Sequence, residues 1–294
     1  MPFLTGIMLG VLMDRTAHAG SSRTVGTLVV LGDSVGVGLG DPVAGRGWRG
    51  FAPLLADALA PQRFINLSVN GARLGSVRRD QLPVAVRARP DVAVVVAGMN
   101  DTMRSDFDPH LLHANMDRIV ADLTGTGALV LTVRYHDHGQ VFRLPAALHR
   151  ILASRIAELN AVFDVVVRRH SAPVVDLARQ PGIYAKDAWA VDRLHPSELG
   201  HRILARAFAE RVAEAGLVAG EVSLACAGGL TVTRTQRVAW LIAKGIPWLL
   251  RRGTDLVPHL VVTMARAAYA DQIAAGRALY PEEPEPAVTV TEQV

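Results

Sequence analysis

Short, continuous runs of apolar residues recur along the chain and are separated by segments with a different periodicity. The clearest run is TLVVL at 27–31, which ends directly in Gly-Asp-Ser. A run that is apolar throughout, rather than at every second position, is typical of a strand buried on both faces in a parallel sheet. Similar runs occur at 64–67, 92–97 and 128–133, and a weaker one occurs at 173–177.

The segments between these runs carry apolar residues three and four positions apart, which is the spacing of one face of a helix. Two such sets are Phe51, Leu54, Leu55, Ala58 and Leu59, and Leu111, Leu112, Met116, Ile119, Val120 and Leu123. Alternating strands and helices predict right-handed βαβ units and a parallel sheet covered by helices on both faces. Ligands of such sheets bind beyond the carboxyl ends of the strands, so the residues directly after each run are the first candidates for a functional site.

Length and composition narrow the class of protein. The 294 residues can hold one large domain, or one domain and a smaller appendage. The net charge of +4 comes from 31 basic and 27 acidic residues spread along the chain. A nucleic-acid-binding protein more often carries a dense basic block, so we expect no nucleic-acid partner. Cys226 is the single cysteine, which excludes an internal disulfide and a cysteine-based metal site.

Four polar clusters stand where the predicted strands end. GDSVG at 32–36 follows the first strand, and NLSVNG at 66–71 spans the end of the second. GMND at 98–101 follows the third strand, and DRLHP at 192–196 follows the fifth and precedes a helical segment. Because the carboxyl ends of parallel strands meet at one edge of a sheet, we expect all four clusters at the same rim.

Ser34 is the candidate nucleophile. A serine hydroxyl is a weak nucleophile at neutral pH and needs an adjacent base. A serine at a strand-to-helix turn has an exposed oxygen, and Gly32 and Gly36 permit a tight turn there. The alternative interpretation is structural, since Asp33 and Ser34 are both common helix caps.

His195 is the candidate base, and Asp192 lies three residues before it. A carboxylate at this spacing can accept a hydrogen bond from the imidazole Nδ1–H, which fixes the tautomer and leaves Nε2 for the serine. A helix then begins after Pro196, with an apolar face formed by Ile203, Leu204, Ala207, Phe208 and Val212. Taken alone, the Asp-x-x-His pattern is also consistent with a solvated loop.

Acyl transfer also needs hydrogen-bond donors for the developing oxyanion. The backbone N–H groups of Ser34 and Gly71 and the side-chain amide of Asn100 are the candidates. Each of these motifs has a structural alternative, because Asn-Gly is a common turn and Asn-Asp a common helix cap.

Together, Ser34 in GDSV, Gly71 in NLSVNG, Asn100 in GMND and His195 in DRLH resemble the four sequence blocks of the SGNH/GDSL hydrolase superfamily, in the same chain order. The resemblance covers about residues 26–212. It implies an α/β, flavodoxin-like three-layer α/β/α fold with a mostly parallel five-stranded sheet. One departure is Val35, which stands where the name-giving motif has leucine.

For function, the resemblance implies a serine esterase that acts on small-molecule carboxylic esters of lipids or acylated carbohydrates. Ser34, His195 and Asp192 would form a catalytic triad with an acyl-enzyme intermediate, without metal or cofactor. Ser34, Gly71 and Asn100 would form the oxyanion hole. Two alternatives stay open: an acyltransferase that uses the same triad with a sugar or another alcohol as acceptor, and a catalytically silent binding domain.

The residues that select the substrate are less clearly marked. We expect Asp33, Trp48, Tyr135 and His136 to contact it, because they follow the first and fourth strands or lie in the glycine-rich segment after Ser34. Arg46 is a further candidate in that segment. The trio His136, Asp137 and His138 could also bind a metal, but such trios more often form polar loops, so we predict no metal site.

The N-terminal segment, residues 1–24, lies outside the resemblance. Its apolar stretch 3–13 and the small-residue sequence at 17–19 resemble a signal peptide, although no Lys or Arg precedes the stretch. The segment could instead be a short packed helix, or the start codon could lie at Met8 or Met13. We expect a cytoplasmic protein, with export as the alternative.

A catalytic domain at 25–215 would leave a C-terminal extension at 216–280, for which we predict a helical appendage similar to the tails of actinobacterial members of the family. Its helical spacing includes Val238, Leu241, Ile242, Gly245, Trp248 and Leu249, with a second apolar segment at 256–268. The extension either packs on the catalytic domain or contacts a membrane surface, for which Trp240, Trp248, Arg251 and Arg252 are suited. The Pro- and Glu-rich stretch 281–294 predicts a disordered tail.

Overall fold

The structure is a computed structural model that describes residues 23–45, 47–142 and 146–229. The predicted N-terminal apolar segment, Arg46, the helical extension beyond 229 and the disordered tail all lie outside the described residues. In the part of the chain that is described, none of the helices combines the length and the apolar character needed to cross a membrane.

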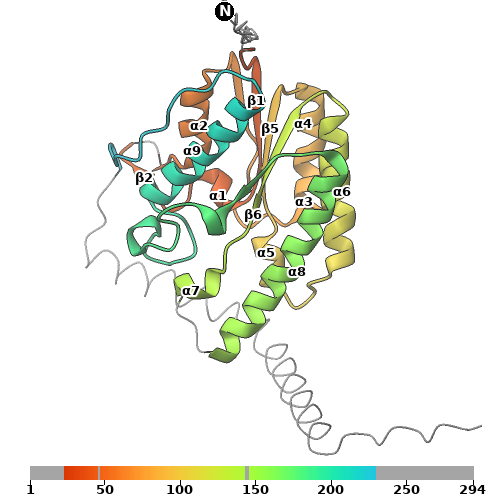
Figure 1. Cartoon of the computed structure of the whole chain (residues 1–294), viewed down its shortest axis with the longest axis vertical. Coiled ribbons are helices and arrows are strands. Elements are labelled where there is room, and N and C mark those ends of the chain that lie inside the picture. The colour runs from red at the N-terminus through yellow and green to blue at the C-terminus, as the bar shows by residue number, and fades with distance from the viewer. Residues whose placement is uncertain (1–22, 46, 143–145, 230–294) are drawn as a thin grey trace, which may run out of the picture.

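A five-stranded parallel sheet forms the centre of the fold (Figure 1). Its strands lie in the order β4-β1-β5-β6-β7. They are β1 (Thr27–Gly32), β4 (Arg63–Asn66), β5 (Val92–Val96), β6 (Leu129–Arg134) and β7 (Val174–Asp176). Counted along the chain within this sheet, the order is 2-1-3-4-5, as in flavodoxin-like folds. The five predicted strands and the fold class are therefore confirmed.

The apolar runs differ in how deeply they are buried. All five residues of β5 are buried, and β1 is buried from Leu28 to Gly32. In β4, by contrast, Arg63, Phe64 and Asn66 are exposed. The apolar run at 64–67 predicted a strand buried on both faces, but β4 pairs only with β1 and lies at the edge of the sheet.

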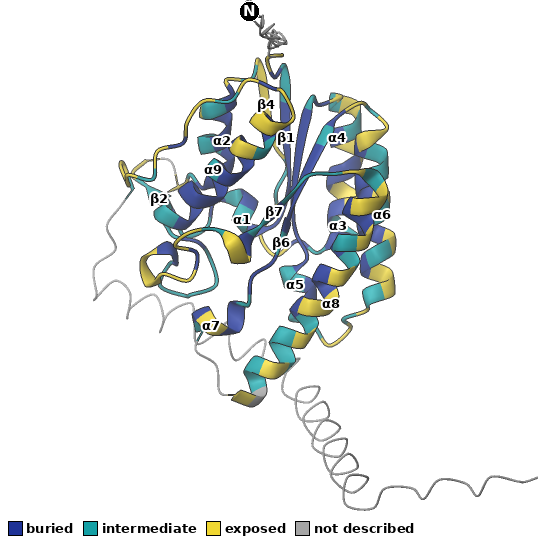
Figure 2. Ribbon diagram, viewed as in Figure 1, coloured by how far each residue is buried: buried dark blue, intermediate teal, exposed yellow. Residues whose placement is uncertain are grey.

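Helices cover both faces of the sheet, and Figure 2 shows the strands as the most buried layer. The helices α2 (Phe51–Leu59) and α9 (Glu198–Glu214) pack together on one face. The other face carries α4 (Leu82–Ala88), α6 (Pro109–Thr124) and α8 (Ala146–His170). The short elements are α1 (Ser34–Val37), β2 (Pro42–Val43), β3 (Gly47–Trp48), α3 (Leu74–Ser76), the π-helix η1 (Val77–Gln81), α5 (Met99–Thr102), α7 (His138–Phe142), and the 3-10 helices η2 (Leu177–Arg179) and η3 (Lys186–Ala188).

The predicted helical faces are largely those that the structure buries. The five apolar residues predicted for the helix after His195 are all buried in α9. In α6, Leu111 differs from the prediction, because it lies in the first turn and is 54% exposed. Residues 217–229 run without helix over the catalytic domain, where Leu217 and Val222 are buried.

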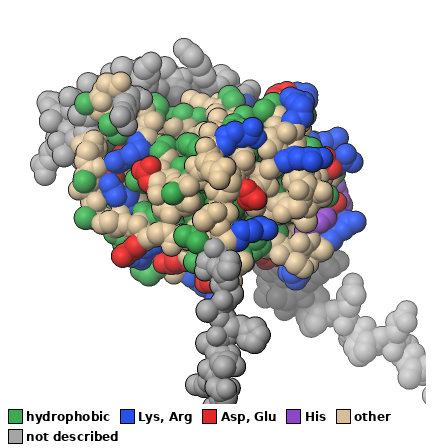
Figure 3. Space-filling model, turned by 90° about the horizontal axis from the view of Figure 1, so that it is seen from above, with side chains coloured by type: hydrophobic (Ala, Val, Ile, Leu, Met, Phe, Trp, Pro, Cys, Tyr) green, Lys and Arg blue, Asp and Glu red, His purple; other side chains and the backbone are tan. Residues whose placement is uncertain are grey.

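Charged side chains are dispersed over the face shown in Figure 3. Lys and Arg residues are interspersed there with acidic and neutral ones, and they do not form a single dense patch. This distribution matches the spread of charge along the sequence.

Three histidines are buried inside the domain: His136, His138 and His201. The ring of His201 donates from Nε2 to the Leu39 carbonyl at 2.9 Å and accepts the Phe51 N–H at Nδ1 at 3.2 Å, so it ties α9 to the loop between α1 and α2. Burial lowers the pKa of all three rings, to about 3 for His136 and about 4 for the other two. The domain therefore folds around neutral imidazoles.

The buried histidines predict a loss of stability in acid. Their pKa values are about 6.5 in the unfolded chain, so the unfolded state binds more protons than the folded state below that pH. At pH 5 each histidine lowers the free energy of unfolding by about 2 kcal/mol. Asp33, whose pKa burial raises to about 6, acts in the opposite direction and restores about 1 kcal/mol.

Urea titrations at pH 7 and pH 5 measure this effect. The three histidines and Asp33 together should make the free energy of unfolding about 4 to 5 kcal/mol lower at pH 5. An equal or higher value at pH 5 would show that the three rings are not held neutral by the fold.

Candidate active site

Ser34 occupies the first position of α1, directly beyond the carboxyl end of β1. The strand end is fixed by Gln81 of the π-helix η1, whose side-chain amide accepts the Gly32 N–H at 2.8 Å and donates to the Gly32 carbonyl at 2.9 Å. Asp33 caps α1 by accepting the Val35 N–H at 3.0 Å. The turn therefore presents Ser34 at a defined place on the rim, where the residue is 7% exposed.

The side chains of Ser34, His195 and Asp192 form a continuous hydrogen-bonded chain. Nε2 of His195 lies 2.8 Å from Oγ of Ser34, and Nδ1 lies 2.7 Å from Oδ2 of Asp192. The carboxylate can only accept from Nδ1–H, so the neutral ring presents a lone pair at Nε2 to the serine hydroxyl. The structure brings together the three residues that the sequence predicted as a triad.

Asp192 is held in its charged form by several donors. Its Oδ1 accepts the backbone N–H groups of Leu194 at 2.9 Å and His195 at 3.0 Å, in addition to the ring contact at Oδ2. Burial favours the neutral acid, but these hydrogen bonds and the nearby imidazole outweigh it and lower the pKa of Asp192. A charged carboxylate at this place can stabilise an imidazolium ring.

Gly71 and Asn100 lie on two neighbouring segments of the same rim. Gly71 turns with φ +77° after β4, and no atom crowds the space where a side chain would project. Asn100 is in α5, beyond β5, and its Nδ2 donates to the Ala72 carbonyl at 3.0 Å and lies 3.4 Å from Oδ2 of Asp33. The amide of Asn100 thus joins the Gly71 loop to the residue before Ser34.

Asp101, for which the sequence pattern indicated only a possible helix cap, helps to form the site. Its Oδ2 accepts the Leu74 N–H at 3.1 Å, and its Oδ1 pairs with Nε of Arg73 at 3.1 Å. These contacts fix the segment that follows Gly71 against α5. The signal in the sequence was an acidic residue next to Asn100, but nothing there showed which backbone group it would accept.

Asp33 is buried beside the proposed triad. Burial raises the pKa of its carboxyl to about 6, although the Val35 N–H and His195 both favour the charged form. Its side chain is only 2% exposed, so it faces Asn100 and the backbone rather than open space.

The four residues predicted to contact substrate differ in exposure. Trp48, on β3, is 46% exposed. Asp33, Tyr135 and His136 are buried. Asn160 of α8 accepts the Tyr135 N–H and donates to its carbonyl, both at 2.8 Å, and so draws the chain after β6 beneath the rim. In this structure, Trp48 alone among the four offers open surface to a ligand.

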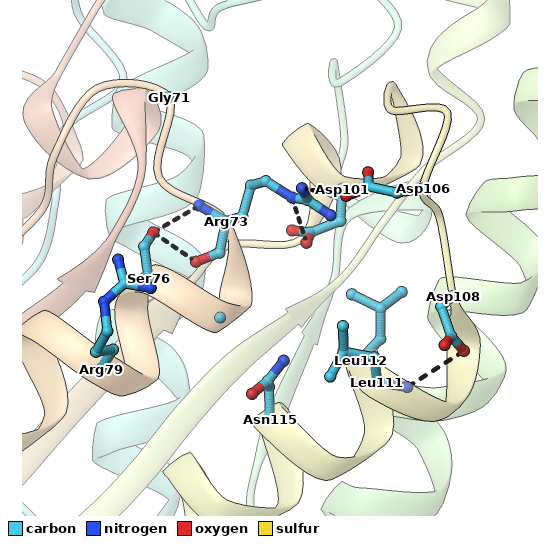
Figure 4. A pocket seen from close by; sticks show the side chains of 11 residues that line it. Gly71, Arg73, Ser76, Arg79, Asp101, Asp106, Asp108, Leu111, Leu112 and Asn115 are labelled. Carbon is cyan, nitrogen blue, oxygen red and sulfur yellow. Dashed lines mark hydrogen bonds and ion pairs between the residues drawn. The ribbon is translucent and has the colours of Figure 1, made fainter.

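A pocket of about 360 Å³ adjoins Gly71 on the side of α3 and α6 (Figure 4). Figure 4 shows Arg73 extending toward Asp101 and Asp106, with Leu111 and Leu112 across from it on α6. The other lining residues are Gly75, Ser76, Arg79, Asp108 and Asn115. Most of the lining residues are charged or polar, although the apolar parts of the side chains, including Leu111 and Leu112, contribute much of the surface.

A second pocket, of about 620 Å³, borders the turn that carries Asp192 and His195. Its lining includes Trp189, Val191 and Arg193. In the described ranges, no group of three or more His, Cys, Asp or Glu side chains could hold a metal ion.

Solved structures share this fold at low sequence identity. LAE5, an α/β hydrolase enzyme from the metagenome of Lake Arreo, Spain, is 21% identical, with a TM-score of 0.53 over 65% of this chain and 96% of that chain. The acetylxylan esterase Axe2 from Geobacillus stearothermophilus is 19% identical, with a TM-score of 0.52 over 65% and 95%. The lipase/acylhydrolase from Enterococcus faecalis is 20% identical, with a TM-score of 0.50 over 65% and 95%.

Comparison at the level of families is more specific. A search of curated proteins finds no match to the sequence. The model of the GDSL-like lipase/acylhydrolase family matches residues 30–203, which is more than half of the chain and runs from β1 into α9. The protein therefore belongs to the GDSL-like lipase/acylhydrolase family and is a serine hydrolase of the esterase type.

Proposed function

We propose that the protein cleaves carboxylic esters through a covalent acyl-enzyme on Ser34, with His195 as general base and Asp192 as the group that orients it. The observation that carries the proposal is the hydrogen-bonded chain from Ser34 Oγ through the His195 ring to Asp192, with contacts of 2.8 and 2.7 Å. A nucleophile and base within this distance, with the base oriented by a third group, are what serine acyl transfer needs.

In the proposed reaction, Nε2 of His195 takes the Ser34 proton while Oγ attacks the ester carbonyl carbon. The carbonyl π electrons move to the oxygen, which becomes the oxyanion of a tetrahedral intermediate. The imidazolium, stabilised by Asp192, then gives its proton to the departing alkoxide as the ester C–O bond breaks. Water, deprotonated by the same ring, attacks the acyl-enzyme, and the acid leaves with Ser34 restored.

The oxyanion would accept hydrogen bonds from the backbone N–H groups of Ser34 and Gly71 and from Nδ2 of Asn100. Gly71 supports this role because it lies in a turn with φ +77° and has no side chain, and the space beside its Cα is open. Asn100 supports it because the Ala72 carbonyl fixes one N–H of its amide at 3.0 Å. The second N–H, whose contact with Oδ2 of Asp33 is long at 3.4 Å, would turn to the oxyanion. Preorganised donors stabilise the transition state because they need no reorientation as charge develops.

For the substrate, we propose an ester with a short acyl group and a hydroxylated alcohol portion, such as an acylated sugar. The pocket beside Gly71 supports this class, because its lining is rich in charged and polar side chains and has Leu111 and Leu112 as its large apolar residues. Such a lining can form hydrogen bonds with sugar hydroxyls. A long alkyl chain would remove water from these polar side chains without offering them hydrogen bonds in return, which costs free energy.

The first test replaces Ser34 with alanine. Ser34→Ala should lower kcat for p-nitrophenyl acetate by about 10³-fold or more, because no nucleophile remains. A fluorophosphonate probe should label the unaltered protein at Ser34, as mapped by mass spectrometry of peptides. Ser68→Ala is the matched control, since Ser68 lies in the loop after β4 and its Oγ has no hydrogen-bond partner among the described residues. Equal turnover by Ser34→Ala and the unaltered protein would refute the proposal.

The second test concerns the oxyanion. Asn100→Ala should lower kcat by about 10²-fold, the usual effect of losing one such donor. KM should stay within about threefold, because the donor acts mainly on the transition state. Steady-state kinetics on p-nitrophenyl acetate measure both, and a thermal melt shows that the variant is folded. An unchanged kcat would remove Asn100 from the oxyanion hole.

The third test concerns the acyl group. We expect kcat/KM at least about tenfold higher for p-nitrophenyl acetate than for the palmitate ester, because a long chain gains about 0.8 kcal/mol per methylene only where an apolar channel buries it. Acetylated xylo-oligosaccharides should release acetate, which a coupled assay detects. A preference for palmitate would contradict the proposed substrate class.

A further inference from the structure

Two histidines lie behind the turn that carries the proposed triad. Nε2 of His138 is 2.9 Å from the carbonyl oxygen of Arg193, which stands between Asp192 and His195. Nδ1 of the same ring is 3.0 Å from Nε2 of His136. Both residues are only 2% exposed, so no substrate reaches their rings in this structure.

The carbonyl fixes the direction of these hydrogen bonds. A carbonyl oxygen only accepts, so the proton of the neutral His138 ring must be on Nε2. Its Nδ1 then carries a lone pair and accepts from Nε2–H of His136. Nδ1 of His136 is left as an acceptor with no hydrogen-bond partner among the described residues. His136 thus donates to His138, and His138 donates to the Arg193 carbonyl.

Arg193 needs an external support. Its φ of +56° puts it in the left-handed region, which costs a residue with a side chain about 1 kcal/mol or more. Its N–H donates to the Ala190 carbonyl at 3.1 Å, and its own carbonyl takes the hydrogen bond from His138. Because Arg193 lies between Asp192 and His195 in the chain, a change in its conformation would move the ring that faces Ser34.

The histidine pair is itself anchored in the core. Its rings pack against Trp189, with centroid distances of 5.0 Å from His136 and 4.8 Å from His138. Trp189 is fixed by a hydrogen bond from its Nε1 to the Ile183 carbonyl at 2.6 Å. Asn160 fixes the peptide of the residue before His136 from α8. Through the two histidines, the turn is therefore held in place by contacts with the segment after β6 and with α8, and not only by hydrogen bonds within its own loop.

We propose that His138, backed by His136, is a positioning residue for the general base: its Nε2–H holds the Arg193 carbonyl and thereby keeps His195 in reach of Ser34. This inference rests on the proposed function, because it concerns the same reaction. It assigns His136 a place behind the site, whereas the sequence suggested direct contact with substrate. His138 touches none of the reacting atoms, so it acts through the turn.

The test compares two replacements of His138 that differ in their ability to donate. Gln can place an amide N–H near the position of Nε2, whereas Leu cannot. We expect His138→Leu to lower kcat for p-nitrophenyl acetate by about 10- to 100-fold, since small displacements of a catalytic group have effects of this size. KM should stay within about threefold, and His138→Gln should retain kcat within about threefold of the unaltered protein.

A kcat for His138→Leu within threefold of the unaltered protein, whatever its melting temperature, would overturn the inference and leave His138 a packing role only. A second measurement needs no variant. Nitrogen-15 NMR at pH 7 should show His136 and His138 as neutral rings protonated at Nε2, and a proton on Nδ1 of His138 would also overturn the inference. Failure of the proposed function is distinguishable, because it would abolish the difference between the unaltered protein and Ser34→Ala.

Discussion

The contact between the His195 ring and the Ser34 hydroxyl is the interaction on which the proposed activity depends. It joins residues 161 positions apart at 2.8 Å, and a shift of 1 Å would break it. A parallel sheet makes such a contact possible because the segments after its strands all emerge at one edge. Ser34 is placed there by the end of β1, and His195 by the turn that leads into α9.

At strand ends and in loops, many backbone N–H and C=O groups find no partner in the sheet or in a helix, yet each such group needs a hydrogen bond when it is buried. Buried side chains supply it here. Gln81 serves both polar groups of Gly32, Asn160 those of Tyr135, and His201 joins the Leu39 carbonyl to the Phe51 N–H. Each of these side chains satisfies the backbone and at the same time fixes a segment that leads to the site. The rim can therefore be polar, buried and rigid at once.

Much of this arrangement could be predicted from the sequence. Continuous apolar runs predicted the strands of the sheet. The polar residues directly after them made Ser34, Gly71, Asn100 and the Asp192–His195 pair candidates for the site. Both features can be recognised within a few neighbouring residues. A strand that is buried on both faces is a continuous apolar run, and a site residue at its end is a polar residue directly after that run. The burial of Tyr135 and His136 could not be predicted, since it depends on Asn160 in a helix that begins later in the chain. The exposure of β4 and the roles of Gln81 and Asp101 likewise depend on partners distant in sequence.

The proposed activity requires four separate segments of the chain to meet at one reacting centre. A crystal structure of the protein after reaction with an alkyl fluorophosphonate would show whether they do. We expect phosphorus bonded to Oγ of Ser34, with Nε2 of His195 still beside that oxygen. The phosphoryl oxygen should lie within about 3 Å of the Gly71 N–H and of Nδ2 of Asn100. An adduct on another residue, or a phosphoryl oxygen directed away from both donors, would contradict this expectation.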